Sequence, residues 1–439
     1  WPQKGGVYRW VGEAFGKKWG FLAIWLQWIE STIWFPTVLT FAAVSLAFMG
    51  PGQRWDEALA ANKWYVLIVV LCVYWAATLL NLRGMKTSAG VTKWGTIIGT
   101  IIPGAILILL GLGYWAGGNP ILLDMSWDKL VPDMSNFNNL VLAASIFLFY
   151  AGMEMSAVHV KDVNNPGRNY PLAILISAII TVLIFVLGTL AIGFIIPNSQ
   201  INLVQSLLIT YDSYFSFFGL GWMNWILALA LAVGVLAQVT AWVGGPSKGL
   251  YQVGLAGNLP PVMQKRNKNN VQMGILLIQG GIVTLLSIMF VIMPSVQSAY
   301  QIISQLTIIL YLIMYMLMFA SGIYLRYREP NTPRTFRIPG GRTFGMWVVG
   351  GLGLLASLAA FLVSFIPPNQ ITVGSSTMYV LLLVVGTFIF AGIPFIIHAM
   401  AKPSWKRPVD PEDAFEPFGW EKSNGSHSAA TPSHSISHE

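Results

Sequence analysis

The chain has 439 residues, of which 55% are hydrophobic and only 10% are charged, with a formal net charge of +8. Ordinary soluble domains carry about 25% charged residues, so this composition excludes a soluble domain and indicates a membrane protein. The basic residues lie in short stretches between apolar segments rather than on one soluble face, which excludes a nucleic-acid-binding protein, and the single Cys72 excludes a disulfide framework and a thiolate metal site.

Ten apolar segments are each long enough to cross a bilayer, which takes about 20 helical residues. They cover residues 21–49, 64–82, 95–116, 139–160, 170–195, 222–245, 273–293, 301–325, 345–366 and 377–400. We therefore predict an all-α polytopic membrane protein with three parts. These are a cytoplasmic loop at 1–20, a transmembrane domain at 21–400 and a cytoplasmic tail at 401–439.

The basic residues also predict the orientation of the chain. If its beginning is cytoplasmic, the inner loops hold 22 of the 25 lysines and arginines, and the outer loops hold only Arg54, Lys63 and Lys129. Loops rich in lysine and arginine stay in the cytoplasm. We therefore predict that both ends of this chain are cytoplasmic.

The first apolar segment contains a carboxylate, Glu30, with Gln27 about one helical turn before it and Trp28 and Trp34 nearby. Carboxylates are costly inside a bilayer, so they mark functional sites. Glu30 either lines a substrate cavity or pairs with a polar neighbour inside the helix bundle.

The fourth apolar segment is interrupted by Glu154, which follows Gly152 and Tyr150. The glycine weakens the helix where a polar ligand can meet exposed backbone. Glu154 either lines a cavity and responds to protonation or binds freed backbone amides, and Tyr150 either offers its hydroxyl to a substrate or packs in the core. This combination predicts a binding site for a small polar solute, and hence a transporter.

The loop after this segment carries Lys161, Asp162 and Arg168. These residues form either a cytoplasmic gate or an ordinary set of solvated charges. The sequence shows neither the His-Glu-x-x-His pattern nor a nucleophile with its base, and no channel filter loop is visible. We therefore expect neither an enzyme nor a channel, and we expect no metal and no cofactor.

The tail is rich in Ser, Pro, Glu and His and has no apolar periodicity, so we expect it to be mostly disordered. It holds His427, His434 and His438. These histidines are either solvated or form a pH-sensing element, because histidine changes charge near neutral pH.

Several motifs occur in an order that resembles the amino acid/polyamine/organocation (APC) transporters. They are Gly5-Gly6-Val7-Tyr8 with Phe15-Gly16, Gly152-Met153-Glu154 with Asn165-Pro166-Gly167-Arg168-Asn169-Tyr170-Pro171, and Gly245-Pro246-Ser247-Lys248-Gly249-Leu250-Tyr251 with Asn258-Leu259-Pro260. The Tyr-x-Gly-x-Glu pattern at 150–154 and His159 most resemble the glutamate/γ-aminobutyrate antiporter group.

This resemblance implies twelve helices, the first ten of which form two inverted five-helix repeats of the leucine-transporter type. The ten segments here would be helices three to twelve, so we expect the sequence to be incomplete at its N-terminus. The family's broken first helix supplies backbone amides for the substrate carboxylate, and such a helix end suits an anion. Residues 1–439 alone are therefore expected not to transport.

The resemblance also assigns candidate substrate-binding residues in later segments. Trp242 resembles the gate indole of the family's eighth helix, and Gln238 lies on the same helical face, where related antiporters can carry a carboxylate. Tyr311 and Tyr315 share a face of segment 301–325 and resemble gate tyrosines of the tenth helix, although tyrosines at this spacing also pack in cores.

The function that the resemblance implies is exchange of an amino acid for its decarboxylation product by alternating access. Glutamate and γ-aminobutyrate are the leading pair, with a bacterial inner membrane, a cytoplasmic decarboxylase as functional partner and acid resistance as the outcome. Three alternatives remain: a proton-coupled permease with the proton on Glu154 or Glu30, another amino acid and amine pair, and a sensor without flux.

Overall fold

The computed structural model describes residues 1, 3–50, 52–126, 139, 141, 143, 146, 151–334, 336–341, 343–368, 374–406 and 414–422. All regular secondary structure in these residues is helical. Nine helices among them are long and apolar enough to cross a membrane. The chain is therefore an all-helical, multi-pass membrane protein, as the sequence predicts.

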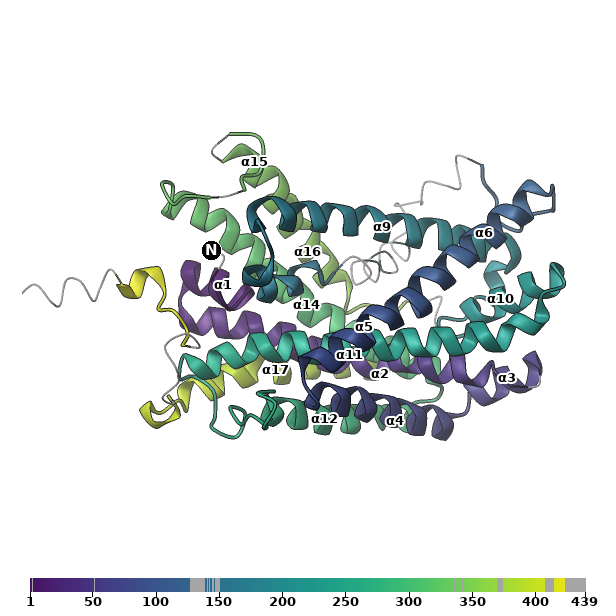
Figure 1. Cartoon of the computed structure of the whole chain (residues 1–439), viewed down its shortest axis with the longest axis horizontal. Helices are drawn as coiled ribbons and strands as arrows, with labels where there is room; N and C mark the ends of the chain where they lie inside the picture. The colour runs from purple at the N-terminus through teal and green to yellow at the C-terminus, as the bar shows by residue number, and fades with distance from the viewer. Residues whose placement is uncertain are drawn as a thin grey trace, which may run out of the picture.

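The spanning helices and their connections follow one another along the chain (Figure 1). In order, the helices are α1 (Val7–Phe15), α2 (Lys17–Ala47), α3 (Gln53–Ala60), α4 (Lys63–Leu82), α5 (Met85–Thr96), η1 (Ile97–Ile101), α6 (Ile102–Ala116), η2 (Met153–Asp162), α9 (Pro166–Ile195), η3 (Asn198–Gln200), α10 (Ser206–Phe217), η4 (Gly221–Met223), α11 (Asn224–Leu255), α12 (Met273–Ser287), α13 (Met289–Ile292), α14 (Val296–Arg328), α15 (Phe344–Met346), η5 (Trp347–Gly351), α16 (Leu352–Val363), α17 (Ser376–Ala399) and η6 (Pro403–Trp405).

Nine of the ten predicted segments coincide with these spanning helices. Of the remaining one, 139–160, residues 140, 142, 144, 145 and 147–150 lie outside the described residues, and its last part forms η2 rather than a spanning helix. Several helices are longer than their apolar segments; α11 runs to Leu255 and α14 to Arg328. The reason is that a helix continues beyond the hydrocarbon region into polar surroundings, so hydropathy marks the membrane-embedded part only.

Residues 1–20 are not the simple loop that we expected, because α1 occupies Val7–Phe15. Val7, Tyr8 and Val11 are almost fully buried in the main core, together with residues of α2. A short amphipathic helix can be stable here because tertiary packing, rather than its own length, stabilises it.

Helix α2 lies at the centre of the described bundle. In its most apolar stretch 78% of the residues are buried, against none in α9. Elsewhere, α11 meets η1 backbone to backbone, because a β-carbon placed on Gly99 would lie 2.3 Å from the backbone of Gly234. Such small residues allow close helix approach in membrane proteins. The central position of α2 brings its polar side chains into the interior.

Part of the predicted tail is packed against α1 rather than disordered. Arg9 donates a 3.2 Å hydrogen bond to the Pro417 carbonyl oxygen, and Trp420 donates a 3.1 Å bond to the carbonyl oxygen of Gly12. Phe418 is fully buried, and Lys17 forms an ion pair with Glu421 at 2.5 Å. This contact is not predicted from apolar periodicity, because it depends on a few aromatic residues that do not repeat at a regular spacing.

Candidate functional site

Glu154 lies just after a sharp change in backbone direction. Gly152 has φ +105°, and the 3₁₀ helix η2 begins at Met153. A non-glycine residue rarely adopts this φ value. The predicted weak point at Gly152 is thus an irregular stretch of backbone that leads directly into the carboxylate.

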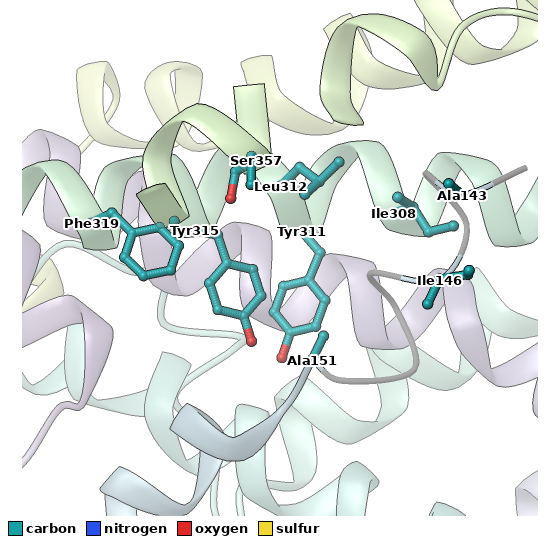
Figure 2. A pocket seen from close by; sticks show the side chains of 11 residues that line it. Ala143, Ile146, Ala151, Ile308, Tyr311, Leu312, Tyr315, Phe319 and Ser357 are labelled. Carbon is teal, nitrogen blue, oxygen red and sulfur yellow. The ribbon is translucent and has the colours of Figure 1, made fainter. Parts of the chain in front are cut away.

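Three donors converge on the Glu154 carboxylate. Tyr311 and Gln27 both donate to Oε1, the latter at 3.1 Å, and Tyr315 donates to Oε2 at 2.6 Å. Tyr315 also accepts a 3.1 Å bond from the backbone amide of Gly152. Figure 2 shows both tyrosine hydroxyl groups directed toward the chain at Ala151. Three donors suit an ionised carboxylate, which only accepts hydrogen bonds.

Trp242 packs directly against the irregular backbone. A β-carbon on Gly152 would lie 2.7 Å from the Trp242 ring, a distance that real β-carbons almost never show. The ring of Trp34 on α2 lies 5.6 Å from the ring of Trp242, centroid to centroid. Gly152 therefore serves two purposes, since it adopts the positive φ and leaves room for the indole.

A cavity of about 530 Å³ lies beside this group. Its lining includes a carboxylate, two indoles, an amide and hydroxyl groups, contributed by Glu30, Trp34, Gln238, Trp242, Ser304 and Tyr311. A volume of this order suits a small organic solute. We call this space the transport cavity.

Glu30 is almost fully buried, with 2% of its surface exposed. Ser31 Oγ lies 2.8 Å from Glu30 Oε1 and 2.6 Å from the carbonyl oxygen of Gln27. A hydroxyl has one proton to donate, and the carbonyl can only accept. The Ser31 hydroxyl thus cannot give full hydrogen bonds to both oxygens while Glu30 is ionised.

Tyr311 and Ala151 line both the transport cavity and a second cavity of about 410 Å³. This second cavity is mostly apolar, with Ile308, Leu312 and Phe319 from α14 and Ser357 from α16 in its wall (Figure 2). Movement of the Tyr311 side chain would therefore change both spaces at once.

The structure brings together most of the predicted binding residues. Gly152, Glu154, Trp242, Tyr311 and Tyr315 form one connected group. Glu30 and Gln238 line the adjacent transport cavity, and Gln238 is exposed to it.

The other predicted site residues lie away from this group or outside the described part of the chain. Tyr150, His427, His434 and His438 lie outside the described residues, as do the side chains of Lys161 and Asp162. Arg168 is exposed in the first turn of α9. The proposed cytoplasmic gate of these three charged residues therefore stays a prediction.

Sequence reasoning missed two residues of the site. In the sequence Gln27 stands out only as a neighbour of Glu30, but its amide binds Glu154, 127 residues away. Trp34 stands out only as a nearby aromatic residue, but it contacts Trp242. A polar residue inside an apolar segment was the available signal for Gln27. Its partner on another helix could not be inferred from spacing.

Within the described residues, no group of three or more His, Cys, Asp or Glu side chains is placed to hold a metal ion. The arrangement instead offers carboxylates, amides, hydroxyls and indoles around a space of solute size. Such a site can bind a small amine or amino acid through charge-assisted hydrogen bonds and aromatic contact.

A family model described as amino acid permease matches residues 1–390. The chain belongs to the APC amino acid permease family. Its members are transporters rather than enzymes, which confirms the prediction that this chain is not an enzyme. An uncharacterized transporter of Legionella pneumophila subsp. pneumophila is 38% identical over 395 residues, covering 90% of this chain and 84% of that protein.

Two further relatives have more specific descriptions. A glutamate/γ-aminobutyrate antiporter of Lactococcus lactis subsp. lactis is 32% identical over 401 residues, covering 91% of this chain and 79% of that protein. A probable agmatine/putrescine antiporter of the same organism is 24% identical over 341 residues, covering 77% and 70%. The permease family thus includes relatives that exchange amino acids or amines.

Proposed function

We propose that this protein exchanges an amino acid for its decarboxylated amine, with glutamate and γ-aminobutyrate as the leading pair. The observation that carries the proposal is the transport cavity, in which Glu30, Gln238 and Trp242 face a space of about 530 Å³. The similarity to the Lactococcus glutamate/γ-aminobutyrate antiporter supports this choice of pair.

The charges around the cavity suit both members of such a pair. Glu30 supplies a carboxylate to attract an ammonium group, which glutamate and γ-aminobutyrate both carry. Gln238 is neutral, so it adds no repulsion toward a substrate carboxylate and can donate to it through its amide. Trp242 and Trp34 provide aromatic faces that attract cations.

Alternating access would use the irregular backbone at Gly152. Trp242 packs on this backbone, and Tyr311 and Tyr315 bind it through Glu154 and Gly152. A shift of η2 would therefore move gate residues on α11 and α14 together. Irregular backbone beside a central cavity is a general feature of secondary transporters.

We further propose a bacterial cell membrane as the location, with both chain ends cytoplasmic and a cytoplasmic amino acid decarboxylase as functional partner. Decarboxylation of glutamate consumes one proton and releases carbon dioxide. Import of glutamate and export of γ-aminobutyrate would then remove a proton from the cytoplasm in each cycle. This cycle would support acid resistance.

A second candidate function is proton-coupled uptake of an amino acid. The observation that favours it is the position of Ser31 Oγ between two oxygens that both need its single proton. A proton on Glu30 would supply the missing donor, so Glu30 is the candidate proton carrier in this alternative. An exchanger for another amino acid and amine pair would use the same cavity with other contacts.

Radiolabelled glutamate uptake distinguishes these functions. The full-length protein is placed in liposomes that are either empty or loaded with γ-aminobutyrate, at acidic and at neutral pH. We expect uptake only into the loaded liposomes. Uptake into empty liposomes together with acidification of the lumen would instead establish a proton-coupled permease, and binding without flux would indicate a sensor.

A pair of tryptophan variants supplies the matched control. Trp242→Ala removes an indole from the transport cavity, whereas Trp222→Ala removes an indole that is 63% exposed just before α11. We expect Trp242→Ala to lower exchange at least tenfold and Trp222→Ala to leave it nearly unchanged. Equal effects of the two substitutions would contradict the role of the cavity.

A further inference from the structure

A smaller cavity of about 200 Å³ lies at the other end of the bundle from α1, between α3, α10 and the beginning of α11 (Figure 1). Its lining includes two carboxylates, an amide and three aromatic rings, one of them from Phe48. We call it the outer pocket, and its wall includes Gly50, Asp56, Tyr211, Asp212, Asn224 and Trp225. None of the described residues in its wall is basic.

Asp56 is buried with an oxygen that lacks a hydrogen bond. Only 5% of the Asp56 surface is exposed, and its Oδ1 atom is buried without a partner among the described residues. A buried acceptor of this kind is costly unless a donor or a cation satisfies it. This unsatisfied oxygen points to a ligand that supplies the missing donor when the protein functions.

A second buried acceptor lines the same cavity. Asn224 donates through Nδ2 to Asp212, which leaves Asn224 Oδ1 buried without a partner in the described structure. The wall therefore presents oxygen acceptors from Asp56, Asp212 and Asn224. A primary ammonium group has three N–H donors, so it matches the number of acceptors, and its positive charge is attracted by carboxylates.

The backbone leaves space for this arrangement at Gly50. A β-carbon at this position would lie 2.1 Å from Asp56 Oδ1. Trp225 adds an aromatic face to the wall, and such faces attract cations. The absence of a side chain at Gly50 therefore allows the carboxylate to occupy its buried position.

The outer pocket also adjoins the transport cavity, since Tyr211 lines both. The Tyr211 hydroxyl donates a 2.7 Å bond to the Pro103 carbonyl, so it is already committed elsewhere. The outer pocket and the space through which a substrate would pass thus share a wall residue.

We propose that the outer pocket is a second binding site, specific for the primary ammonium group of an amine. Its place on the transport path rests on the proposed function, whereas the binding itself does not. A metal ion would find only two carboxylates here, and the described residues contain no cluster of three or more metal-binding side chains. We therefore choose the ammonium group.

Binding of n-butylammonium to the full-length protein in lipid nanodiscs tests this proposal. The comparison ligand is butyltrimethylammonium, which has the same charge but no N–H donors. We expect n-butylammonium to bind and butyltrimethylammonium to bind at least tenfold more weakly. Equal affinity for the two would overturn the assignment to a hydrogen-bonded ammonium group.

Substitutions in the wall localise the site. Asp56→Asn and Asp212→Asn should each weaken n-butylammonium binding about tenfold, while Asp124→Asn, which changes an exposed carboxylate outside the pocket, should not. Melting temperatures of all variants show whether they fold. Folded pocket variants with wild-type affinity would exclude this site. Binding of Ca²⁺ or Na⁺ that disappears in the same variants, without amine binding, would replace the proposal by a metal site.

The same measurement in Trp242→Ala separates this site from the transport cavity. We expect this variant to lose exchange but to keep n-butylammonium binding that depends on Asp56. If exchange of glutamate for γ-aminobutyrate fails in the wild type while this binding persists, only the proposed function is wrong. If Trp242→Ala abolishes the binding in a folded protein, the ligand occupies the transport cavity and the outer site is excluded.

Discussion

Tyr311 on α14 donates a hydrogen bond to Glu154, a carboxylate 157 residues earlier in the chain. Tyr315, one turn further along α14, binds the other carboxylate oxygen and also accepts from the Gly152 amide. Two hydroxyl groups of one helix therefore hold the irregular backbone at the centre of the site. This relationship connects the two predicted gate tyrosines to the intramembrane carboxylate Glu154.

Removal of either hydroxyl should impair exchange. Tyr315→Phe removes a donor to Glu154 and an acceptor for Gly152, whereas Tyr311→Phe removes one donor only. A hydrogen bond to a charged group contributes about 1.5–3 kcal/mol, so both variants should lower the melting temperature and the exchange rate, Tyr315→Phe more strongly. Tyr324→Phe, on an exposed face of α14, is the control and should behave like the wild type.

Gly152 should not tolerate a side chain. Alanine there would have φ +105° and a β-carbon 2.7 Å from Trp242, so we expect Gly152→Ala to abolish exchange. Gly281→Ala adds the same methyl group in α12 where nothing lies within 4 Å, and it should leave exchange unchanged. Normal exchange by Gly152→Ala would refute this account of the site.

Gln238→Glu should change substrate preference. The side chain lines the transport cavity and is exposed to it, so a new carboxylate would attract ammonium groups and repel substrate carboxylates. In competition experiments we expect inhibition by putrescine to strengthen relative to inhibition by glutamate, by about tenfold. Unchanged relative inhibition would mean that substrates do not approach this position.

Contact between the 414–422 segment and the beginning of α2, at Lys17, should weaken in acid. Partial burial raises the pKa of Glu421, but the Lys17 side chain and the Phe418 backbone outweigh it and hold the pKa below its usual value of 4.5. A lowered folded-state pKa means that the stabilisation is complete above 4.5 and is lost as the pH falls through the lower folded value. The measurement is the rate of proteolytic cleavage within 414–422 as a function of pH, and we expect this rate to increase as the pH falls. Lys17→Gln should remove most of this pH dependence.

When no amine is present, the outer pocket should destabilise the folded protein as the pH rises. This is the opposite of the pH dependence of the 414–422 contact. Burial raises the pKa of both Asp56 and Asp212, and the two carboxylates and Glu57 repel one another. A raised folded-state pKa makes the ionised form costly, so this cost is present above the raised pKa and disappears as the pH falls. Asp56→Asn should therefore raise the melting temperature at neutral pH, and its advantage should shrink in acid.

The candidate site was predictable in part because its members are conspicuous locally. Glu30 and Glu154 stand out as carboxylates in apolar segments, and Gly152 stands out beside Glu154. The bond between Gln27 and Glu154 was not predictable, because it joins two helices whose relative rotation is set by packing. The outer pocket escaped prediction for a related reason, since Asp56 and Asp212 read as ordinary loop or helix charges until the fold brings them together.

The amino-acid sequence by itself determined that the chain is an all-helical membrane protein of the amino acid permease family. Long apolar segments can satisfy their backbone in a bilayer only within helices or closed barrels, and this constraint acts segment by segment. Only the tertiary structure decided which helix is central, that Tyr311 and Tyr315 hold Glu154, and that 414–422 covers α1. These features depend on contacts between residues distant in the chain, and close packing of many helices at once determines such contacts.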